Sequence, residues 1–499
     1  MDSPVVSSAE MRAAEEAAIA RGIKIEALMD EAGAGVARTV TKFFPRPGMC
    51  IVFAGKGHNG GDALVAAERL QRSGWQIETR LPFPESECSE LTRKKLAVLH
   101  ETPESSDRPP ADGTLAASPC RSRTIILDGL LGVGTRSLLR EPIRATAREI
   151  NRLRQERNAF VFAIDLPTGF NADTGEIDPD SVIADVTVTI GFAKHGLIAD
   201  GALDFVGRIE VVPLAELEVG GARNEFMATA QSLTGLIPRR KFGAHKNQQG
   251  RIGIVAGSKG FVGAAIMTAG GALRSGAGLV ELFVTEDIYE IAAAAAPPEV
   301  MVKSTRAYKE LADEKIDVWA LGPGLGKANA SRIRDLIGRV EQPMVIDADG
   351  LNILAEEIDV LRRCRGPRLL TPHPGEMQRL FASGKMARAG IARNFCEEFP
   401  VTLLLKGSRT IVAQRGQPLS FNTTGNPGMA TGGMGDVLTG VCAGLIGQGL
   451  SLYDAARIGA WACGRAAEIA IFEGRETEES LLPSDVLANL GTAFSELRG

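Results

Sequence analysis

The chain has 499 residues, of which 44% are hydrophobic and 23% are charged, values typical of a soluble globular protein with more than one domain. Its 56 lysines and arginines against 61 aspartates and glutamates give a net charge of −5, which excludes an electrostatic basis for binding nucleic acid or an anionic membrane. The seven cysteines form no C-x-x-C pair, so we expect reduced thiols in a cytoplasmic protein.

The first half of the chain alternates short apolar segments with helical ones. Residues 1–22 are polar and alanine-rich and predict a helix, not a signal peptide. A helix is also predicted over residues 63–73, and strands over 49–54, 75–81, 124–127, 160–164, 182–190 and 208–212. Residues 102–120 are rich in proline and serine and predict a surface loop. This alternation indicates a parallel sheet with helices on both faces.

A second alternating series begins after residue 224. Strands are predicted over residues 251–256, 318–321, 343–346, 368–370 and 402–405, with helices between them. No segment has the length and hydrophobicity of a membrane span. We place the boundary near residues 217–224, which predicts two α/β domains of three layers (α/β/α) over residues 1–220 and 221–499.

A glycine-rich turn, GKGHNGGD over residues 55–62, follows the first predicted strand. It contains the pattern G-x-G-x-x-G, which binds a dinucleotide pyrophosphate in this position, and Glu78 would suit the ribose. Asp62, however, would repel a pyrophosphate. A tight turn capped by Asn59 or Asp62 explains the same residues without any ligand.

Two later strand ends in the first half also combine aspartate with glycine. Asp128 precedes Gly132 and Gly134, and Asp165 precedes a proline and a glycine. Ligands of open parallel sheets bind beyond the carboxyl ends of the strands. One such aspartate is commonly a helix cap, but Asn59, Asp128 and Asp165 together predict a single site.

The first half resembles the NAD(P)H-hydrate epimerase domain in residues 9–15, the 59–62 turn, and the loops that begin at Asp128 and Asp165. The resemblance implies a Rossmann-like fold that binds the hydrates NADHX and NADPHX beside a potassium ion. Asp165 is our candidate for acid–base catalysis. The implied potassium ligands, which are suitable hard oxygens, are Asn59, Asp128 and Thr168. The implied hydrate contacts are His58, Asn59, Gly60, Gly61, Asp62, Gly132, Val133, Gly134, Thr135, Arg136, Ser137, Leu138 and Asp165. His58 and Ala63 replace the family's usual asparagine and glycine.

Several glycines lie just before an apolar helical pattern in residues 425–446. A turn over residues 432–435 would present free N–H groups at the positive end of a helix, which suits a phosphate. Asp436 would repel that anion if binding were its only role. It fits instead a base that takes the proton of a hydroxyl attacking the phosphate. This turn therefore predicts phosphoryl transfer.

Other strand ends in the second half carry glycine or polar residues at 257–260, 322–326, 347–352, 371–376 and 406–410. Each has a simpler explanation as a structural turn, a helix cap, a rigid loop residue or a solvated charge. Together they predict a large ligand along one edge of the sheet.

This half resembles the ribokinase-like superfamily, and within it the ADP- or ATP-dependent NAD(P)H-hydrate dehydratases. The motifs that carry the resemblance are G-P-G-x-G at 322–326, D-A-D-G-L-N at 347–352, T-P-H-P-G-E at 371–376, K-G-x-x-T at 406–410 and the glycine turn before Asp436. The implied hydrate contacts are Ala264, Gly324, His373 and Asp436. The implied nucleotide contacts are Lys406, Gly407, Ser408, Arg409, Thr410 and Gly435. Asn247 stands where a common form of the family has glycine.

The two resemblances imply a bifunctional repair enzyme that epimerises the R and S hydrates of NADH and NADPH. It would dehydrate the S form at the expense of ADP, yielding AMP and phosphate. Magnesium is expected with the nucleotide, and we expect a homo-oligomer. The alternative is a small-molecule kinase of the same fold whose first half only binds a nucleotide. A stable phosphorylated product would indicate the kinase. We expect ADP and not ATP as the phosphoryl donor, by analogy with the fused two-domain members of the family, which look prokaryotic.

Overall fold

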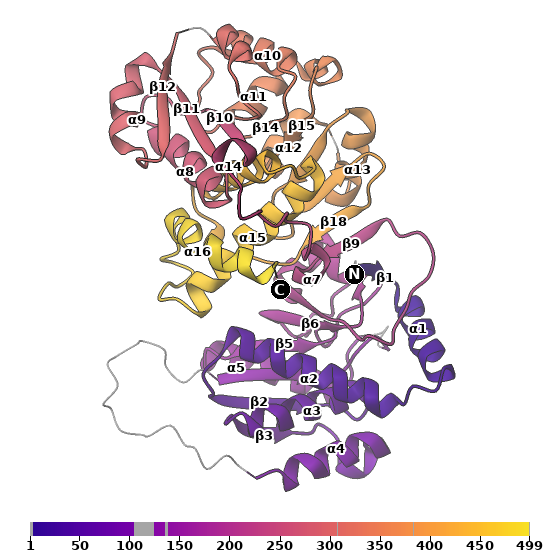
Figure 1. The fold of residues 1–499 in the computed structure, drawn as a ribbon. Helices are drawn as coiled ribbons and strands as arrows, with labels where there is room; N and C mark the ends of the chain where they lie inside the picture. Colours follow the sequence, from indigo (N-terminus) through magenta and orange to yellow (C-terminus); the bar gives the residue numbers. More distant parts are fainter. Residues whose placement is uncertain (1–2, 104–123, 135–137, 307, 383, 499) are drawn as a thin grey trace, which may run out of the picture. The chain divides into compact units, whose positions relative to one another are not determined.

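The computed structural model describes residues 3–103, 124–134, 138–306, 308–382 and 384–498. The chain divides into two compact units, Ser3–Arg223 and Asn224–Gly499 (Figure 1). In the described ranges, none of the helices combines the length and the hydropathy that crossing a membrane requires. Most of the loop predicted at 102–120 lies outside the described residues.

The first unit is built on a six-stranded, fully parallel sheet. Its strands lie in the order β3 (Gln76–Arg80), β2 (Met49–Ala54), β4 (Thr124–Gly129), β5 (Phe160–Ile164), β6 (Val186–Ile190) and β8 (Arg208–Val212). Ile51 and Phe53 pack with Ile150 of helix α5 (Ile143–Glu156), while Val52, on the opposite face, is equally buried. Helices α2 (Ile25–Phe43) and α3 (His58–Arg72) contact the strands, and α4 (Glu90–Glu101) packs on α3.

The amino-terminal segment differs from the prediction of one helix over residues 1–22. Strand β1 (Ser3–Val6) comes first and pairs in parallel with β7 (Ala193–Lys194), and helix α1 (Ser8–Ala20) follows. Ser7 ends the strand because its hydroxyl accepts the N–H of Glu10 while the Glu10 carboxylate accepts the N–H of Ser7. This capping box fixes where the helix starts.

The second unit contains a mixed sheet. Strands β10 to β16 run parallel to one another, and β17 runs antiparallel to its two neighbours, β16 and β18. The order is β12 (Val300–Thr305), β11 (Leu279–Thr285), β10 (Arg251–Val255), β13 (Val318–Leu321), β14 (Met344–Ile346), β15 (Arg368–Leu370), β16 (Thr402–Leu405), β17 (Ile411–Gln414), β18 (Leu419–Asn422) and β9 (Glu225–Ala228). Strands β9, β11, β12, β17 and β18 were absent from the prediction.

Helices cover both faces of this second sheet (Figure 1). Ala320, Val345 and Leu369 pack in one core with helices α8 (Val262–Arg274), α14 (Met434–Gly447), α15 (Leu452–Phe472) and α16 (Pro483–Glu496). Trp319 and Ile346, which face the other way, are equally buried. The remaining helices include α10 (Ala330–Arg339), α11 (Asp349–Ala355), α12 (Pro374–Leu380) and α13 (Arg388–Glu398). The predicted α/β class with helix-covered parallel strands is confirmed in both units.

Candidate functional site

The predicted polar residues of the first unit meet at one edge of its sheet. Phe53, Asp128 and Ala163 are in register across β2, β4 and β5, so the residues that follow these strands emerge side by side. Helix α3 begins at His58, five residues earlier than predicted. Its N-cap is Gly57, with no side-chain cap, so the explanation of Asn59 or Asp62 as caps is wrong.

Close packing explains two of the turn's glycines. A Cβ atom on Gly60 would lie 1.9 Å from the carbonyl oxygen of Gly55, and one on Gly61 would lie 2.4 Å from Cε of Met29. Both glycines are buried, whereas His58 is exposed and Asn59 is half-buried. The glycines thus allow α3 to approach the strand end and helix α2. Hydrate contacts by these residues stay predictions.

A buried carboxylate occupies the end of β4. Asp128 is fully buried, and both of its oxygens accept hydrogen bonds from Thr168. Oδ1 accepts from the hydroxyl at 2.7 Å, and Oδ2 accepts from the backbone N–H at 2.8 Å. Burial raises the pKa of Asp128 to about 6, although the bonds from Thr168 lower it. In the described ranges no basic side chain pairs with this carboxylate. Asn59 lies nearby, since its amide donates to the carbonyl of Leu131, whose N–H donates to the Thr168 hydroxyl.

The loop after β4 is only partly described. A Cβ atom on Gly132 would lie 3.5 Å from Cγ of Asn59, so this loop passes over the start of α3. Val133 is half-buried, and Gly134 and Leu138 are exposed. The predicted contacts Thr135, Arg136 and Ser137 lie outside the described residues.

Asp165 follows β5 and forms an ion pair that the sequence did not predict. Its Oδ1 accepts a hydrogen bond from the fully buried ammonium of Lys194, and also the N–H of Ile190 at 3.2 Å. Asp165 has a φ of 66°, a left-handed conformation that costs energy in a residue other than glycine. The signal available in the sequence was a lysine soon after a buried V-T-V-T-I strand.

Two further carboxyl groups surround this ion pair. Burial raises the pKa of Asp62 well above its usual range, and the negative charges of Asp165 and Glu15 raise it further. Burial also raises the pKa of Glu15, again helped by Asp165. The cluster therefore holds three carboxyl groups and one ammonium, an arrangement that favours retention of a proton at Asp62 and Glu15.

The strand ends of the second unit are also aligned. Leu321 and Val255 are in register across β13 and β10, and Leu321, Ile346 and Leu370 are in register across β13, β14 and β15. Gly322, directly after β13, has a φ of 123°, and a Cβ there would lie 1.9 Å from the carbonyl oxygen of Asp347. Only glycine allows these two loops to approach so closely.

Asp347 is the centre of the polar cluster at this edge. Its side chain is almost fully buried, Oδ1 accepts from Nζ of Lys406 at 2.6 Å, and Oδ2 accepts from the hydroxyl of Thr439 on α14 at 2.8 Å. The predicted alternative of a helix cap is wrong for Asp347, since α11 begins two residues later with Ala348 at its N-cap. Lys406 thus bridges to the site's carboxylates and is not a solvated surface charge.

Asp436 lies in the first turn of α14, whose N-cap Gly433 has a φ of 96°. Burial, together with the charge of Asp347, raises the pKa of Asp436 to about 6, while the charge of Lys406 lowers it. A Cβ atom on the neighbouring Gly435 would lie 3.2 Å from Nζ of Lys406. The predicted base is therefore half-buried, beside a carboxylate–ammonium pair, at the positive end of a helix.

His373 is the N-cap of helix α12, and Glu376 lies in its first turn. Nδ1 of His373 accepts the N–H of Gly375 at 3.0 Å, while the Glu376 carboxylate accepts the N–H of His373 at 2.8 Å. The His373 ring is half-exposed. Glu376 is buried, and its Oε2 lies 3.8 Å from Nζ of Lys406. His373 is thus fixed at the edge of the cluster, with its Nε2 3.6 Å from Oε1 of Glu376.

The structure also brings together Ala264 and Gly324, two of the predicted hydrate contacts. A Cβ atom on Gly324 would lie 3.1 Å from Cβ of Ala264 and 2.8 Å from Cβ of Phe261, whose ring is exposed. The hydroxyl of Ser258 donates to the Gly324 carbonyl at 2.7 Å. The loops after β10 and β13 therefore form one surface.

Arg388 hydrogen-bonds to the backbone of the predicted nucleotide loop, residues 406–410. Its guanidinium donates to the carbonyls of Lys406 and Arg409 at 3.2 and 3.1 Å. Gly407 and Ser408 are exposed, whereas Arg409 and Thr410 are buried. Gly407 and Ser408 are thus the members of this loop that face solvent.

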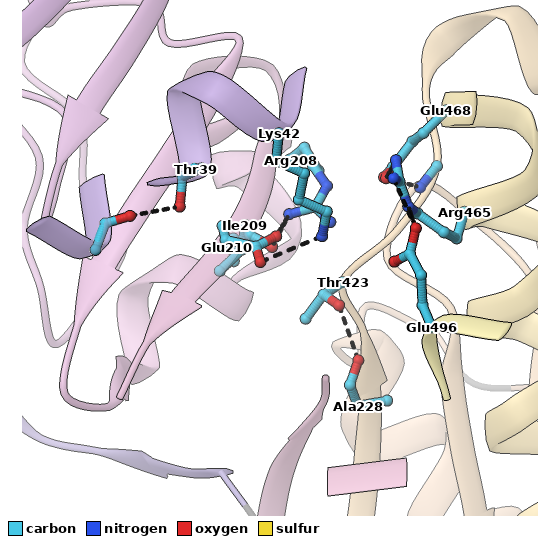
Figure 2. A network of polar contacts seen from close by, with 12 residues as sticks. Thr39, Lys42, Arg208, Ile209, Glu210, Ala228, Thr423, Arg465, Glu468 and Glu496 are labelled. Carbon is cyan, nitrogen blue, oxygen red and sulfur yellow. Dashed lines mark hydrogen bonds and ion pairs between the residues drawn. The ribbon is translucent and has the colours of Figure 1, made fainter. Parts of the chain in front are cut away.

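The glycine-rich segment that leads to Asp436 is anchored to helix α15. Oε1 of Glu468 accepts the N–H of Gly425 at 2.9 Å, and Glu468 pairs with the buried guanidinium of Arg465. Arg465 also pairs with Glu473. Its pair with Glu496 of α16 is drawn in Figure 2. The start of the segment is therefore fixed by a charge network around the buried Arg465 and Glu468.

Two family models match the chain. One, described as NAD(P)H-hydrate dehydratase, matches residues 252–487, and one described as YjeF-related protein N-terminus matches residues 25–196. The chain is 34% identical to the bifunctional NAD(P)H-hydrate repair enzyme Nnr of Moorella thermoacetica, over 88% of this chain and 87% of that protein. The enzyme of the same name from Gloeobacter violaceus is 34% identical over 89% of each chain. The one from Escherichia coli is 33% identical over 96% of this chain and 91% of its own.

Among solved structures, the ADP/ATP-dependent NAD(P)H-hydrate dehydratase from Bacillus subtilis, co-crystallised with ATP and Mg²⁺, covers 55% of this chain and 98% of its own. Its identity is 26% and its TM-score 0.48. The sequence matches to both halves confirm the two resemblances that the motifs carried. The chain belongs to the family of bifunctional NAD(P)H-hydrate repair enzymes.

Proposed function

We propose that this chain restores hydrated NADH and NADPH in two steps. The first half, residues 1–220, interconverts the R and S hydrates, and the second, residues 221–499, dehydrates the S hydrate with ADP as phosphoryl donor. The observation that carries the proposal is Asp436, a half-buried carboxyl group with a raised pKa beside Lys406 and Asp347 at the start of α14. ADP is chosen over ATP by family analogy.

In the proposed dehydration, Asp436 takes the proton of the substrate hydroxyl as its oxygen attacks the β-phosphorus of ADP. The bond between that phosphorus and the bridging oxygen breaks, and AMP leaves. Free N–H groups of residues 432–435 stabilise the transferred group. The carbon–oxygen bond then breaks, phosphate departs, and loss of a proton from the adjacent ring carbon restores the dihydronicotinamide.

Magnesium would arrive with the nucleotide. Both oxygens of Asp347 are already bonded, and one oxygen of Asp349 accepts the N–H of Gly326 at 2.9 Å. The described residues contain no cluster of three metal-ligating side chains. Mg²⁺ prefers phosphate oxygens and water to a cage made of protein side chains alone, so we expect the nucleotide's phosphates to supply part of its ligands.

In the proposed epimerisation, the protonated hydroxyl leaves the ring carbon as water, and water adds to the opposite face as its proton is removed. Asp165 assists these proton transfers. Asn59, Asp128 and Thr168 offer hard oxygens that fit potassium, and the buried Asp128 carboxylate pairs with no basic side chain in the described ranges. Bound potassium would supply the missing positive charge.

The proposed function is tested with the full chain and a mixture of R and S NADPH hydrates. With ADP or ATP present, absorbance of NADPH is expected to recover completely, with release of free phosphate. Recovery that stops with one epimer left would contradict the epimerase assignment. A stable phosphorylated product would indicate the kinase alternative.

Potassium is expected to stabilise the first unit through Asp128. Ligand in 100-fold excess over its Kd stabilises a fold by about 2.7 kcal/mol, which raises the melting temperature of a domain this size by several degrees. Calorimetry in KCl is compared with choline chloride at equal ionic strength. The difference should vanish in Asp128→Asn; an equal response of wild type to both salts would contradict the site.

A further inference from the structure

The buried ammonium of Lys194 is fixed from three directions. It donates to Oδ1 of Asp165, to the hydroxyl of Thr189 at 3.1 Å and to the carbonyl of Ile190 at 3.0 Å. An ammonium has three N–H donors, so all three are used within the protein. The lysine side chain is 0% exposed. Lys194 therefore has no donor left for a ligand.

The bonds at Asp165 all converge on one of its two oxygens. Oδ1 accepts from Lys194, from the N–H of Ile190 at 3.2 Å and from the hydroxyl of Thr189 at 3.4 Å. Within the described ranges no hydrogen bond reaches Oδ2. The backbone of Asp165 is held at a φ of 66°, a costly conformation that persists where the surroundings impose it. One oxygen of this buried carboxylate is thus locked, whereas the other has hydrogen-bonding capacity left among the described residues.

We propose that Lys194 is the positioning residue of the epimerase site, which holds Oδ1 of Asp165 so that Oδ2 faces the hydrate. This inference rests on the proposed epimerase function. Lys194 itself touches no reacting atom. It holds the Asp165 side chain in place near Glu15 of α1 and Asp62 of α3, two further carboxyl groups of the cluster.

A purely structural ion pair is the competing explanation. Buried ion pairs contribute little net stability, because desolvation offsets their attraction, but the removal of one partner is strongly destabilising. Loss of stability alone therefore cannot distinguish the two roles. The distinction lies in the kinetics: a positioning residue lowers kcat in the folded enzyme and alters its pH profile.

The test uses the full chain, with pure R-hydrate of NADPH plus nucleotide as substrate. NADPH then appears only after epimerisation, whereas S-hydrate reports the second half alone. Lys194→Met is expected to lower kcat for the R-hydrate by about 100-fold, with KM changed by less than about threefold. Turnover of S-hydrate should be unchanged. Lys194→Arg keeps the charge, so its kcat for the R-hydrate should be about tenfold higher than that of Lys194→Met.

The pH dependence of R-hydrate turnover distinguishes the two roles, because the loss of a purely structural ion pair would not shift it. Without the ammonium, Asp165 faces the carboxyl groups of Glu15 and Asp62 with no cation, so its protonated form becomes favoured. The acidic limb of the R-hydrate profile in Lys194→Met should therefore shift to higher pH. Part of the lost rate should return as pH rises.

Lys95→Met is the matched control. Lys95 is also buried and pairs with two carboxylates, Glu26 at 2.8 Å and Asp30 at 2.7 Å, in the same unit but outside the cluster. The Lys95→Met variant should lose stability and keep the wild-type kcat for the R-hydrate.

If Lys194→Met fails to fold, Thr189→Val provides the test. This replacement removes one hydrogen bond to Asp165 and one to Lys194, and it should lower kcat about fivefold.

The inference is overturned if Lys194→Met folds with wild-type kcat, or if its rate falls no more than that of Lys95→Met with an unshifted profile. It is also overturned if Lys194→Met does not fold and Thr189→Val has wild-type kcat. The proposed function fails separately, if the wild-type chain does not convert R-hydrate faster than the uncatalysed reaction.

Discussion

Asp436→Asn is expected to lower kcat for dehydration of the S-hydrate by about 10²- to 10⁴-fold, the usual contribution of a general base. Asparagine keeps the shape of the side chain but takes no proton from the substrate hydroxyl. The replacement also removes the repulsion between Asp436 and Asp347, so the free energy of unfolding should change by less than about 1 kcal/mol. The measurement is NADPH absorbance with pure S-hydrate and ADP.

The pH dependence of the wild-type enzyme tests the same assignment. Burial and the charge of Asp347 raise the pKa of Asp436 to about 6. A base acts only when deprotonated, so kcat/KM should be constant above about pH 7 and fall tenfold per unit well below pH 6. Lys406 lowers this pKa, so Lys406→Met should move the limb to higher pH.

Asp454→Asn is the matched control for Asp436→Asn. Asp454 also lies in the first turn of a helix, α15, and bonds only within that turn to Ser451 and Arg457 among the described residues. Its loss should leave dehydration unaffected. A rate for Asp436→Asn within threefold of Asp454→Asn would rule out Asp436 as the base.

Asp165→Asn should abolish the epimerase activity, with a fall in R-hydrate kcat of at least about 100-fold while S-hydrate turnover persists. The same replacement leaves the buried Lys194 without its counter-charge. The removal of one partner from a buried ion pair costs about 3–5 kcal/mol, so thermal stability should fall as well.

The double variant Asp165→Asn with Lys194→Met separates the two effects. It removes both buried charges, so the melting temperature should recover toward that of wild type. Epimerisation should not recover, because neither variant restores a proton acceptor. Recovery of the R-hydrate rate in the double variant would contradict a chemical role for Asp165.

The most accurate sequence predictions concern residues that follow strands beside glycine. Asp128, Asp165 and Asp347 stand at such ends, and parallel strands bring their carboxyl ends together whatever lies between them in sequence. Asp436 was identified by a different signal, an acid at a helix start where the glycine turn suggested an anion. Local chemistry and the rules of parallel sheets were sufficient to place these residues, whose roles stay predictions.

The parts that escaped prediction depend on tertiary pairing. Lys194 reaches Asp165 across 29 positions of sequence, from a two-residue strand that no periodicity reveals. Glu15 comes from a surface-like, alanine-rich helix. Lys406 was assigned to the nucleotide from its motif, whereas only the fold places Asp347 at 2.6 Å from it. Strand β1 is too short to be separated by pattern from the helix that follows.

In each unit one lysine is outnumbered by acids: Lys194 by Asp165, Asp62 and Glu15, and Lys406 by Asp347, Asp436 and Glu376. In the first unit, protons on Asp62 and Glu15 offset part of this excess, in keeping with their raised pKa values. We infer that a ring without negative charge can approach this cluster at little electrostatic cost, whereas the carboxylate of Asp165 repels a pyrophosphate. In the second unit, Lys406 and the N–H groups at the start of α14 offset the acids, so that phosphate groups can be held there.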